Sequence, residues 1–501
     1  MSARLLMLQG TMSHVGKSVL VAALCRILYR DGLRVAPFKA QNMALNSYVT
    51  PDGLEIGRAQ VVQAEAAGLE PEVEMNPVLL KPEADHRSQV VVLGRPIGSF
   101  SASEYYRMKP SLLPIVLDAL ERLRSRFDVV IMEGAGSPAE INLKAHDIVN
   151  MGLARRVEAP VLLVGDIDRG GVFAQLVGTL ELLPPEERAL VKGLIINKFR
   201  GDAALLAPGV RFLEERCGVP VAGIVPYDPD LALAEEDSVA LERPPGEREG
   251  VLDVAVVRLP RIANFDDVDP LRREPGVALR FVSRRGELGQ PDLIVLPGSK
   301  TTVADLEHLR ATGLADSIVA AAGRGAAVVG ICGGFQMLGR AVLDPDGVES
   351  ERPRADGLGL LPVVTVFRPS KTTHRVEARV VADEGLLQGC RGMVVRGYEI
   401  HMGESTSAGS APFLLVSRSG EGCRVPDGAL ARGGWVLGTY IHGLLRNGGL
   451  RRQMLGNLAR RKGVCLPPPD EGGPDPYDKW ASLVRDHLDM RLVYRVLGLE
   501  Q

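Results

Sequence analysis

Two stretches of the sequence carry residue types and spacings that predict chemistry, and the first surrounds Cys332. A short apolar run ends there in Gly-Ile-Cys332-Gly333-Gly, which has the Gly-x-nucleophile-x-Gly form of a sharp turn between a strand and a helix. Such a turn exposes the thiol at the edge of a sheet, and a helix N-terminus favours the attacking thiolate. The alternative is a buried structural cysteine, which the flanking glycines and the preceding strand disfavour.

A cysteine nucleophile needs a base, and His442 is the residue that we favour. It ends the apolar run Val-Leu-Gly-Thr-Tyr-Ile in the same half of the chain, so it would lie at a strand end near Cys332. His401 is the nearest competitor, and either histidine could instead be a core residue bonded to a backbone carbonyl. The backbone amides at Gly333 and at Gly298, where another strand breaks, are candidate donors to an oxyanion.

The second stretch lies near the N-terminus and predicts a phosphate-binding loop. It reads Gly10-Thr11-Met-Ser-His-Val-Gly16-Lys17-Ser18, between an apolar strand and a helical pattern. Backbone amides of such a loop surround a phosphate of ATP, the lysine adds positive charge, and the serine hydroxyl binds Mg²⁺. Five residues separate the outer glycines instead of the usual four, so the loop is a variant. The alternative is an ordinary turn between a strand and a helix.

Further polar residues follow predicted strands at the sheet edge where ligands bind in open α/β folds. Glu133, after Phe-Asp-Val-Val-Ile-Met, is expected to bind Mg²⁺ together with the loop serine, and the alternative is a helix N-cap or a solvated loop acid. Asp166 and Asp168 are further candidates for the metal, or caps of the next helix. Lys39 is a candidate to neutralise a phosphate or a substrate carboxylate, and Asn197 to bond the adenine edge. The alternative for Lys39 and for Asn197 is a structural role or a place on the solvated surface.

The elements that must position these residues alternate along the chain. Short apolar runs alternate with amphipathic helical patterns, which predicts βαβ units and an α/β fold with parallel sheets. The expected strands cover residues 5–8, 35–38, 128–132, 160–164, 193–196, 221–225, 254–259, 293–296, 327–331 and 436–441.

Length and breaker-rich segments divide the chain into domains. At 501 residues it is too long for one ordinary domain. Residues 229–250 are acidic and rich in Pro and Gly, which predicts a linker between a first domain at 1–228 and a second at 251–465. A Pro-rich run opens the C-terminal tail, residues 466–501, which ends in a predicted helix.

Composition argues against several classes of protein. A net charge of −3 gives no reason to expect nucleic acid or a membrane surface as a partner, and no run of about 18 apolar residues occurs. The six cysteines show no metal-ligand spacing and are expected to be reduced thiols. Because the N-terminus lacks the apolar stretch of a signal peptide, we expect a cytoplasmic protein. The pattern leaves the oligomeric state open.

These motifs occur together in a known family, and the sequence closely resembles the cobyric acid synthases, the glutamine-dependent amidotransferases of cobalamin biosynthesis. The first half is similar to dethiobiotin synthetase, and the second resembles a class I glutamine amidotransferase domain. The resemblance covers nearly the whole chain and rests on residues 10–18, 38–49, 55–60, 75–82, 129–143, 165–179, 330–339, 397–403 and 438–444.

The resemblance implies that Cys332 is the nucleophile of a glutaminase and that His442 is its base. The wider amidotransferase class carries a glutamate two residues after this histidine, and Leu444 stands at that position here. The residue that orients the imidazole is therefore not identified. Residues 38–48 and 397–403 are our candidates for contacts with the acceptor.

The two motifs together predict amide formation. A carboxylate is a poor electrophile, and phosphorylation by ATP turns it into an acyl phosphate that ammonia can attack. Lys17, the loop amides and Mg²⁺ are expected to stabilise the transferring phosphoryl group, while Cys332 releases ammonia from glutamine. The resemblance implies that the acceptor is adenosylcobyrinic acid a,c-diamide, amidated at the b, d, e and g carboxylates.

Three alternatives share parts of this pattern. A cobyrinic acid a,c-diamide synthase has the same two-domain plan but uses other carboxylates. A P-loop regulatory or partitioning ATPase would turn over ATP without consuming glutamine. A stand-alone glutaminase would keep its activity after Lys17→Ala and would consume no ATP.

Overall fold

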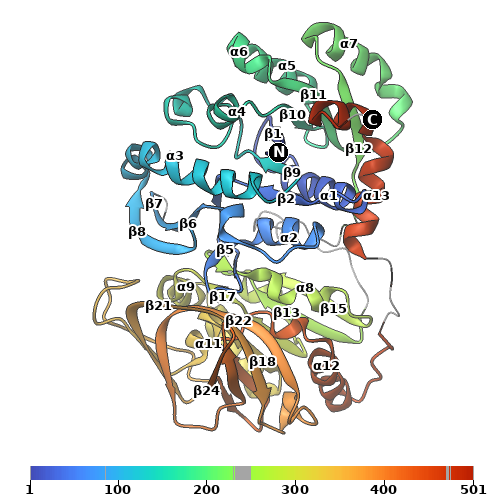
Figure 1. The fold of residues 1–501 in the computed structure, drawn as a ribbon. Helices are drawn as coiled ribbons and strands as arrows, with labels where there is room; N and C mark the ends of the chain where they lie inside the picture. Colours follow the sequence, from blue (N-terminus) through green and yellow to red (C-terminus); the bar gives the residue numbers. More distant parts are fainter. Residues whose placement is uncertain are drawn as a thin grey trace. The chain divides into compact units, whose positions relative to one another are not determined.

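The computed structural model describes residues 2–84, 86–229, 231, 250–469, 473 and 475–499. The chain divides into two compact units (Figure 1): unit 1 comprises Met1–Ala44, Ile56–Ala234 and Pro474–Gln501, and unit 2 comprises Leu45–Glu55 and Glu235–Gly473. The linker predicted at 229–250 lies outside the described residues except at its two ends and at residue 231.

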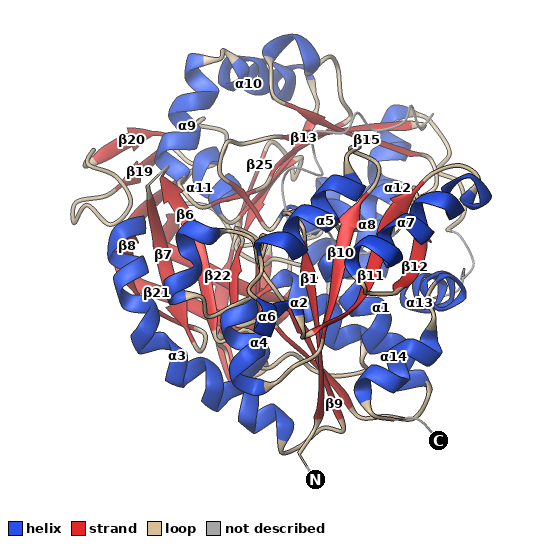
Figure 2. Ribbon diagram, turned by 90° about the horizontal axis from the view of Figure 1, so that it is seen from above, coloured by secondary structure: helices blue, strands red, loops and turns tan. Residues whose placement is uncertain are grey.

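A six-stranded parallel sheet forms the centre of unit 1, with strand order β12-β11-β10-β1-β9-β2. The central strands are buried except at Arg4 and are mostly apolar, because helices cover both faces of the sheet (Figure 2). Since all strands run in one direction, their carboxyl ends meet at one edge. The strands are β1 (Arg4–Gly10), β2 (Val35–Phe38), β9 (Val129–Glu133), β10 (Val161–Asp166), β11 (Val191–Phe199) and β12 (Val221–Pro226).

Two C-terminal helices return to this unit. Trp480 of α13 is buried and donates its indole N–H to the carbonyl oxygen of Val19 in α1, at 2.7 Å. Val493 of α14 belongs to the same apolar core. The tail predicted at 466–501 therefore ends as part of unit 1. The main helices of unit 1 are α1 (Lys17–Arg30), α2 (Arg58–Ala66), α3 (Ala102–Arg124), α4 (Met151–Val157), α5 (Val172–Leu182), α6 (Pro185–Arg188), α7 (Ala207–Cys217), α13 (Pro476–His487) and α14 (Met490–Leu497).

A smaller sheet in unit 1 has the order β3-β6-β7-β8 and precedes α3 in the chain. Helix α3 begins in a capping box, in which Ser101 and Glu104 each accept a backbone amide hydrogen bond from the other. The strands are β3 (Gln41–Met43), β6 (Val78–Ala84), β7 (Arg87–Val92) and β8 (Arg95–Ser101).

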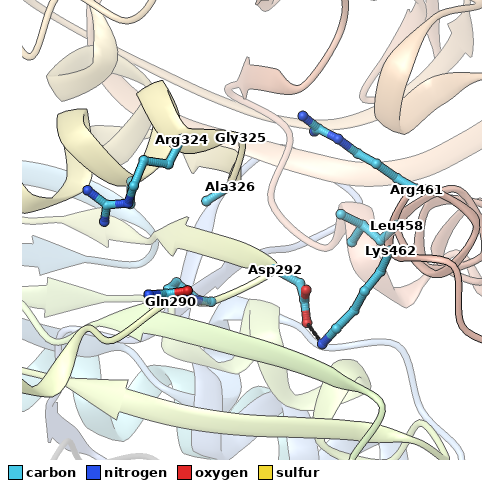
Figure 3. A pocket seen from close by; sticks show the side chains of 10 residues that line it. Gln290, Asp292, Arg324, Gly325, Ala326, Leu458, Arg461 and Lys462 are labelled. Atoms are coloured by element: carbon cyan, nitrogen blue, oxygen red, sulfur yellow. Dashed lines mark hydrogen bonds and ion pairs between the residues drawn. The ribbon is translucent and has the colours of Figure 1, made fainter.

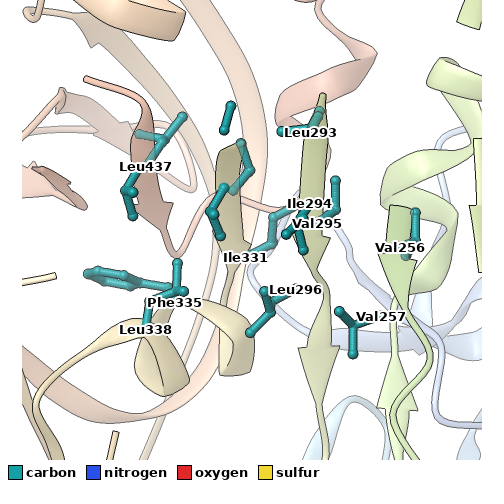
Figure 4. Close-up of a cluster of buried hydrophobic side chains, with 14 of the residues drawn as sticks. Val256, Val257, Leu293, Ile294, Val295, Leu296, Ile331, Phe335, Leu338 and Leu437 are labelled. Carbon is teal, nitrogen blue, oxygen red and sulfur yellow. The ribbon is translucent and has the colours of Figure 1, made fainter. Parts of the chain in front are cut away.

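Unit 2 is built on a second six-stranded sheet, with the order β15-β13-β16-β18-β26-β25. All pairs are parallel except β25 with β26. Figure 4 shows the apolar side chains of β13, β16, β18 and β26 packed with Phe335 and Leu338 of α11. The strands are β13 (Leu252–Val257), β15 (Val277–Val282), β16 (Leu293–Leu296), β18 (Ala327–Ile331), β25 (Ala429–Ala431) and β26 (Val436–Thr439), and the helices are α8 (Asp269–Arg272), α9 (Thr302–Ala311), α10 (Leu314–Arg324), α11 (Gly333–Leu338) and α12 (Gly448–Lys462).

A long antiparallel ribbon and short strand pairs follow, and one of these pairs ends where the chain passes from unit 2 back to unit 1 at Ile56. The ribbon pairs β21 (Val363–Val380) with β22 (Val394–Ser407), and β14 (Ile262–Ala263) pairs with β17 (Gly298–Ser299). The ribbon sheet continues through β19 (Ala341–Leu343), β20 (Arg354–Asp356), β23 (Phe413–Arg418) and β24 (Glu421–Asp427), and the second short pair is β4 (Ser47–Val49) with β5 (Glu55–Gly57).

The α/β fold with parallel sheets in both halves is thus confirmed. The predicted domain boundaries place residues 45–55 with the first half, whereas these residues pack with unit 2. Among the described residues, no helix combines the length and the apolar character needed to span a membrane.

Candidate active site

Cys332 lies at a strained turn between β18 and α11, with φ 53° and ψ −109°. A positive φ is unusual for a residue with a side chain, and such strain concentrates at functional sites. The flanking positions leave no room for anything but glycine. A Cβ at Gly330 would lie 2.7 Å from the carbonyl oxygen of Gly334, and a Cβ at Gly334 would lie 2.0 Å from that of Leu296. The sequence pattern therefore forms the predicted nucleophile elbow.

His442 follows β26 and is held by a carboxylate. Its Nδ1 lies 2.7 Å from Oδ2 of Asp267, and Oδ1 of the same carboxylate accepts the backbone N–H of Gly443 at 2.7 Å. Both side chains are buried. The carboxylate thus keeps the proton on Nδ1 and leaves Nε2 to exchange a proton with a thiol. Within the described part of the chain, Nε2 is a buried atom with no hydrogen-bond partner.

The charges around His442 favour its protonated form. Burial by itself lowers the pKa of the imidazole, but the Asp267 carboxylate and the neighbouring Cys332 side chain outweigh burial and raise the pKa to about 10. An imidazolium at residue 442 stabilises negative charge that forms on the Cys332 sulfur, and the thiolate is the form that a cysteine nucleophile uses.

The predicted oxyanion donors adjoin these two residues. A Cβ at Gly333 would lie 2.8 Å from the backbone nitrogen of Ser299, and a Cβ at Gly298 would lie 3.3 Å from Cε1 of His442. The turn that contains Gly298 therefore runs between the elbow and the imidazole. β14 pairs with β17 so that Ala263 opposes Gly298. This pairing brings the 3-10 helix Phe265–Val268, which follows β14 and carries Asp267, close to the turn at Gly298.

Asp267 is the residue that sequence reasoning missed. It lies on the short 3-10 helix Phe265–Val268, whereas Leu444, at the position where a glutamate was sought, is fully buried in the apolar core. The signal available in the sequence was the acidic pair Asp266-Asp267, which Asn264 and Phe265 separate from the two-residue strand β14. Its distance along the chain from His442 hid the relationship.

Residues 397–403, predicted to contact the acceptor, adjoin the thiol site. The Tyr398 ring stacks on His442 with ring centroids 5.1 Å apart, and the Cys332 thiol lies 3.5 Å from the carbonyl oxygen of Ile400. His401, the competing histidine, stacks on Tyr440 at 3.7 Å. The structure thus brings Cys332 together with His442, and His401 faces another ring.

A cavity of about 440 Å³ lies elsewhere in unit 2 (Figure 3). Asp292 and Ala326, which line it, directly precede β16 and β18, so it opens at the amino ends of these strands. Cys332 follows the carboxyl end of β18. The Asp292 carboxylate is paired there with Lys462 at 2.7 Å. This cavity is therefore distinct from the thiol site.

In unit 1, the predicted phosphate loop joins β1 to α1. Gly16 has φ 97°, and a Cβ there would lie 2.2 Å from Nδ2 of Asn197. A Cβ at Gly10 would lie 2.6 Å from the side chain of Val15. Both glycines are therefore required by this loop. The Asn197 amide, a candidate for adenine contact, donates to the carbonyl oxygen of Val15 at 2.8 Å and so supports the loop.

Polar side chains converge on the Glu133 carboxylate at the end of β9. The Ser18 hydroxyl donates to Oε1 at 2.8 Å, and the Gln63 amide donates to Oε2 at 2.6 Å. Lys39 forms a buried ion pair with Oε1 at 2.9 Å. Burial of Glu133 by itself raises its pKa, but the ammonium groups of Lys39 and Lys17 outweigh burial, so the pKa is lowered. Glu133 is therefore a carboxylate at neutral pH.

This arrangement fits a magnesium ion in the chemistry of its donors. A hydroxyl and an ionised carboxylate oxygen, 2.8 Å apart beside a phosphate loop, are the oxygen ligands that Mg²⁺ takes in nucleotide sites. Lys39, predicted to neutralise a phosphate or a substrate carboxylate, forms its ion pair here with Glu133. The Asp168 carboxylate, also predicted as a ligand, accepts from Arg200 at 2.8 Å, and the structure does not join it to Ser18 and Glu133 in any described contact.

The remaining loop residues also have defined contacts. The Lys17 ammonium donates to the carbonyl oxygens of Met12 at 3.2 Å and Gly136 at 3.3 Å, so it lies across the loop. The Thr11 backbone N–H donates to the carbonyl oxygen of Val164 at 2.9 Å and thereby extends the sheet. Its hydroxyl donates to Gln175 at 3.2 Å.

Comparison with known proteins assigns a domain family to each half. Residues 6–241 match the CobQ/CobB/MinD/ParA nucleotide binding domain, and residues 253–450 match the CobB/CobQ-like glutamine amidotransferase domain. The first match includes the loop at 10–18, and the second includes Asp267, Cys332 and His442. The two halves predicted from the sequence are therefore a nucleotide-binding domain and a glutamine amidotransferase domain.

Curated relatives match the whole chain. The cobyric acid synthase of Sorangium cellulosum (strain So ce56) is 54% identical over 522 residues, covering 100% of both chains. That of Dehalococcoides mccartyi (strain CBDB1) is 52% identical and covers 99% of both chains. That of Moorella thermoacetica (strain ATCC 39073 / JCM 9320) is 52% identical and covers 100% of this chain and 98% of the relative. The chain belongs to the cobyric acid synthase family.

Proposed function

We propose that this protein uses ATP and glutamine to amidate the b, d, e and g carboxylates of adenosylcobyrinic acid a,c-diamide, which yields adenosylcobyric acid. The observation that carries the proposal is the buried Cys332–His442–Asp267 arrangement in a chain that also holds a phosphate loop against Glu133. The names of the full-length relatives support the corrinoid acceptor.

In the glutaminase step, the Cys332 thiolate attacks the side-chain amide carbon of glutamine. Negative charge develops on the amide oxygen, next to the backbone at Gly298 and Gly333. The imidazolium of His442 gives its proton to the departing nitrogen, the carbon–nitrogen bond breaks, and ammonia leaves. Water, deprotonated by the now neutral imidazole, then cleaves the thioester and releases glutamate. Asp267 stabilises the imidazolium that gives its proton in the first transfer and that forms again in the second.

In the synthetase step, a corrin carboxylate takes the γ-phosphoryl group of ATP and becomes an acyl phosphate. The loop amides and Lys17 neutralise charge on the transferring group, and a magnesium ion held by Ser18 and Glu133 would add to this neutralisation. Ammonia attacks the acyl carbon, phosphate leaves, and the amide forms. Lys39 and Gln63 hold the Glu133 carboxylate ionised and oriented.

The test compares glutamine with ammonium chloride as nitrogen donor for wild type and Cys332→Ala, with ATP, Mg²⁺ and the a,c-diamide. We expect the variant to lose glutamine-dependent amidation and to keep ammonia-dependent amidation. Loss of both activities in a folded variant would contradict the division of labour. Amidation of cobyrinic acid at a and c, in place of the four other positions, would instead identify an a,c-diamide synthase.

A further inference from the structure

Residues 45–55 belong to the N-terminal part of the sequence but pack in the amidotransferase unit. The chain leaves unit 1 after Ala44, forms β4 within unit 2, and rejoins unit 1 at Ile56. Two anchors hold the segment. Glu55 forms a buried ion pair with Lys371 at 2.5 Å, and the carbonyl oxygen of Val49 accepts from Arg375 at 3.1 Å.

One side of the segment bonds the turn that carries the orienting carboxylate. The backbone N–H of Ser47 donates to Oδ1 of Asn264 at 2.9 Å, and the Asn46 side chain accepts the N–H of Phe265 at 3.4 Å. Asn264 has φ 53°, a left-handed conformation, and the 3-10 helix with Asp267 begins directly after it. The segment therefore fixes the start of the helix on which Asp267 stands.

The same segment bonds the ring that stacks on the base. The Tyr398 hydroxyl donates to the carbonyl oxygen of Ser47 at 3.3 Å and accepts from the Asn264 amide at 3.2 Å. The Tyr48 ring meets the Tyr398 ring edge-on, with centroids 4.7 Å apart. Because Tyr398 stacks on His442 and also pairs with its backbone, the segment contacts both supports of the imidazole.

The two ends of the segment continue into residues that bond Glu133. Lys39, which forms the buried ion pair with Glu133, lies five residues before Ala44 in the chain. Helix α2 begins two residues after Ile56 and carries Gln63, which donates to Glu133 at 2.6 Å. Both ends of the segment are therefore joined through the chain to side chains that bond Glu133.

We propose that residues 45–55 are a positioning segment that holds the His442–Asp267 pair and makes glutamine hydrolysis depend on the ligands bound in unit 1. Asn264 and Tyr398 are its positioning residues in unit 2. The inference rests on the proposed function, because it takes ATP and the corrinoid as the ligands of unit 1. It adds the residues through which their binding reaches the glutaminase.

Asn264→Gly tests the segment with little backbone strain, since glycine adopts φ 53° freely. The substitution removes both hydrogen bonds of the side chain and leaves Asp267, Tyr398 and His442 in place. Arg432→Gly is the matched control: Arg432 has φ 54° in the same unit, and its side chain donates to Ala322.

Tyr398→Phe, which keeps the stacked ring, serves as the second variant if Asn264→Gly does not fold. Each is assayed for glutamate release with and without ATP, Mg²⁺ and the a,c-diamide, and for amidation with ammonia.

We expect ATP and the a,c-diamide to accelerate glutamate release in wild type and in Arg432→Gly. In Asn264→Gly, kcat/KM for glutamine should fall about 10- to 100-fold, the acceleration should disappear, and the alkaline limb of the pH profile should move to lower pH. Asn264→Asp, which keeps the acceptor for Ser47, should restore part of the rate. Ammonia-dependent amidation should stay within about twofold, because that reaction does not use His442.

Two results would overturn the inference. The first is a rate of glutamate release and a pH profile in Asn264→Gly equal to those of Arg432→Gly. The second is a wild-type rate of glutamate release that is the same with and without ATP and the a,c-diamide. Absence of ammonia-dependent amidation in every protein, wild type included, would instead refute the proposed function. The two failures therefore have different signatures.

Discussion

Asp267→Asn replaces the carboxylate that holds His442 with an amide of the same shape. In the wild type, the pKa of His442 rises from 6.5 to about 10 although burial opposes the rise, so the partner groups stabilise the imidazolium by at least about 5 kcal/mol. Asp267 is the largest of the partner groups that raise this pKa, and Cys332 is the other. A hydrogen bond to a charged group contributes about 1.5–3 kcal/mol, which corresponds to an effect on a rate of about 10- to 100-fold.

The assay is glutamate release from glutamine as a function of pH. We expect kcat/KM of Asp267→Asn to fall about 10- to 100-fold at neutral pH. We also expect the alkaline limb of its pH profile to lie at lower pH than that of wild type, because the imidazolium of the variant loses its proton at lower pH. Asp266→Asn is the matched control, since the neighbouring carboxylate bonds Arg446 at 2.7 Å and not the imidazole. A loss below about fivefold in Asp267→Asn, or an equal loss in Asp266→Asn, would refute the assigned role.

The other predictions concern unit 1 and the buried carboxylates. Lys17→Ala should abolish amidation with either nitrogen donor and leave glutamate release measurable in the absence of ATP, which a coupled phosphate assay and a glutamate assay read together. Lys39→Met should leave the Glu133 carboxylate buried without its ion pair, at a cost of about 3–5 kcal/mol in the free energy of unfolding, and the double variant with Glu133→Gln should recover most of it in denaturant titrations. Asp427 has its pKa raised to about 7, chiefly by burial, so its protonated form contributes stability that is complete below about pH 4 and is lost as the pH rises through 7. Asp427→Asn should therefore show a smaller fall in Tm between pH 5 and pH 8 than wild type, and an identical fall would contradict this account.

The fold could be predicted because its strands are short apolar runs with helices between them. Runs such as those that became β1, β9 and β18 are buried throughout, so apolar content alone located them. The ribbon of β21 and β22 escaped prediction, because its exposed and half-buried residues give no continuous apolar signal. Membership of the cobyric acid synthase family confirms the expectation of a glutamine-dependent amide ligase.

The site could be predicted only where one local pattern carries the chemistry. The elbow at Cys332 and the loop at 10–18 are such patterns, since the backbone conformation itself demands their glycines. Asp267 and the segment at 45–55 make tertiary contacts with residues far along the chain, and no sequence spacing predicts such contacts. Asn197 and Asp168 also lie at strand ends, where they bond the loop and Arg200, and their roles toward adenine and the metal stay predictions.

The central claim is that one part of this chain releases nitrogen from glutamine and another part activates the acid that receives it. Its most direct test supplies glutamine labelled with ¹⁵N in the side-chain amide, together with unlabelled ammonium, ATP, Mg²⁺ and the a,c-diamide, and measures the mass of the product. We predict ¹⁵N in the new amides made by wild type, and amides without ¹⁵N from Cys332→Ala. Labelled product from the variant, or none from wild type, would contradict the claim.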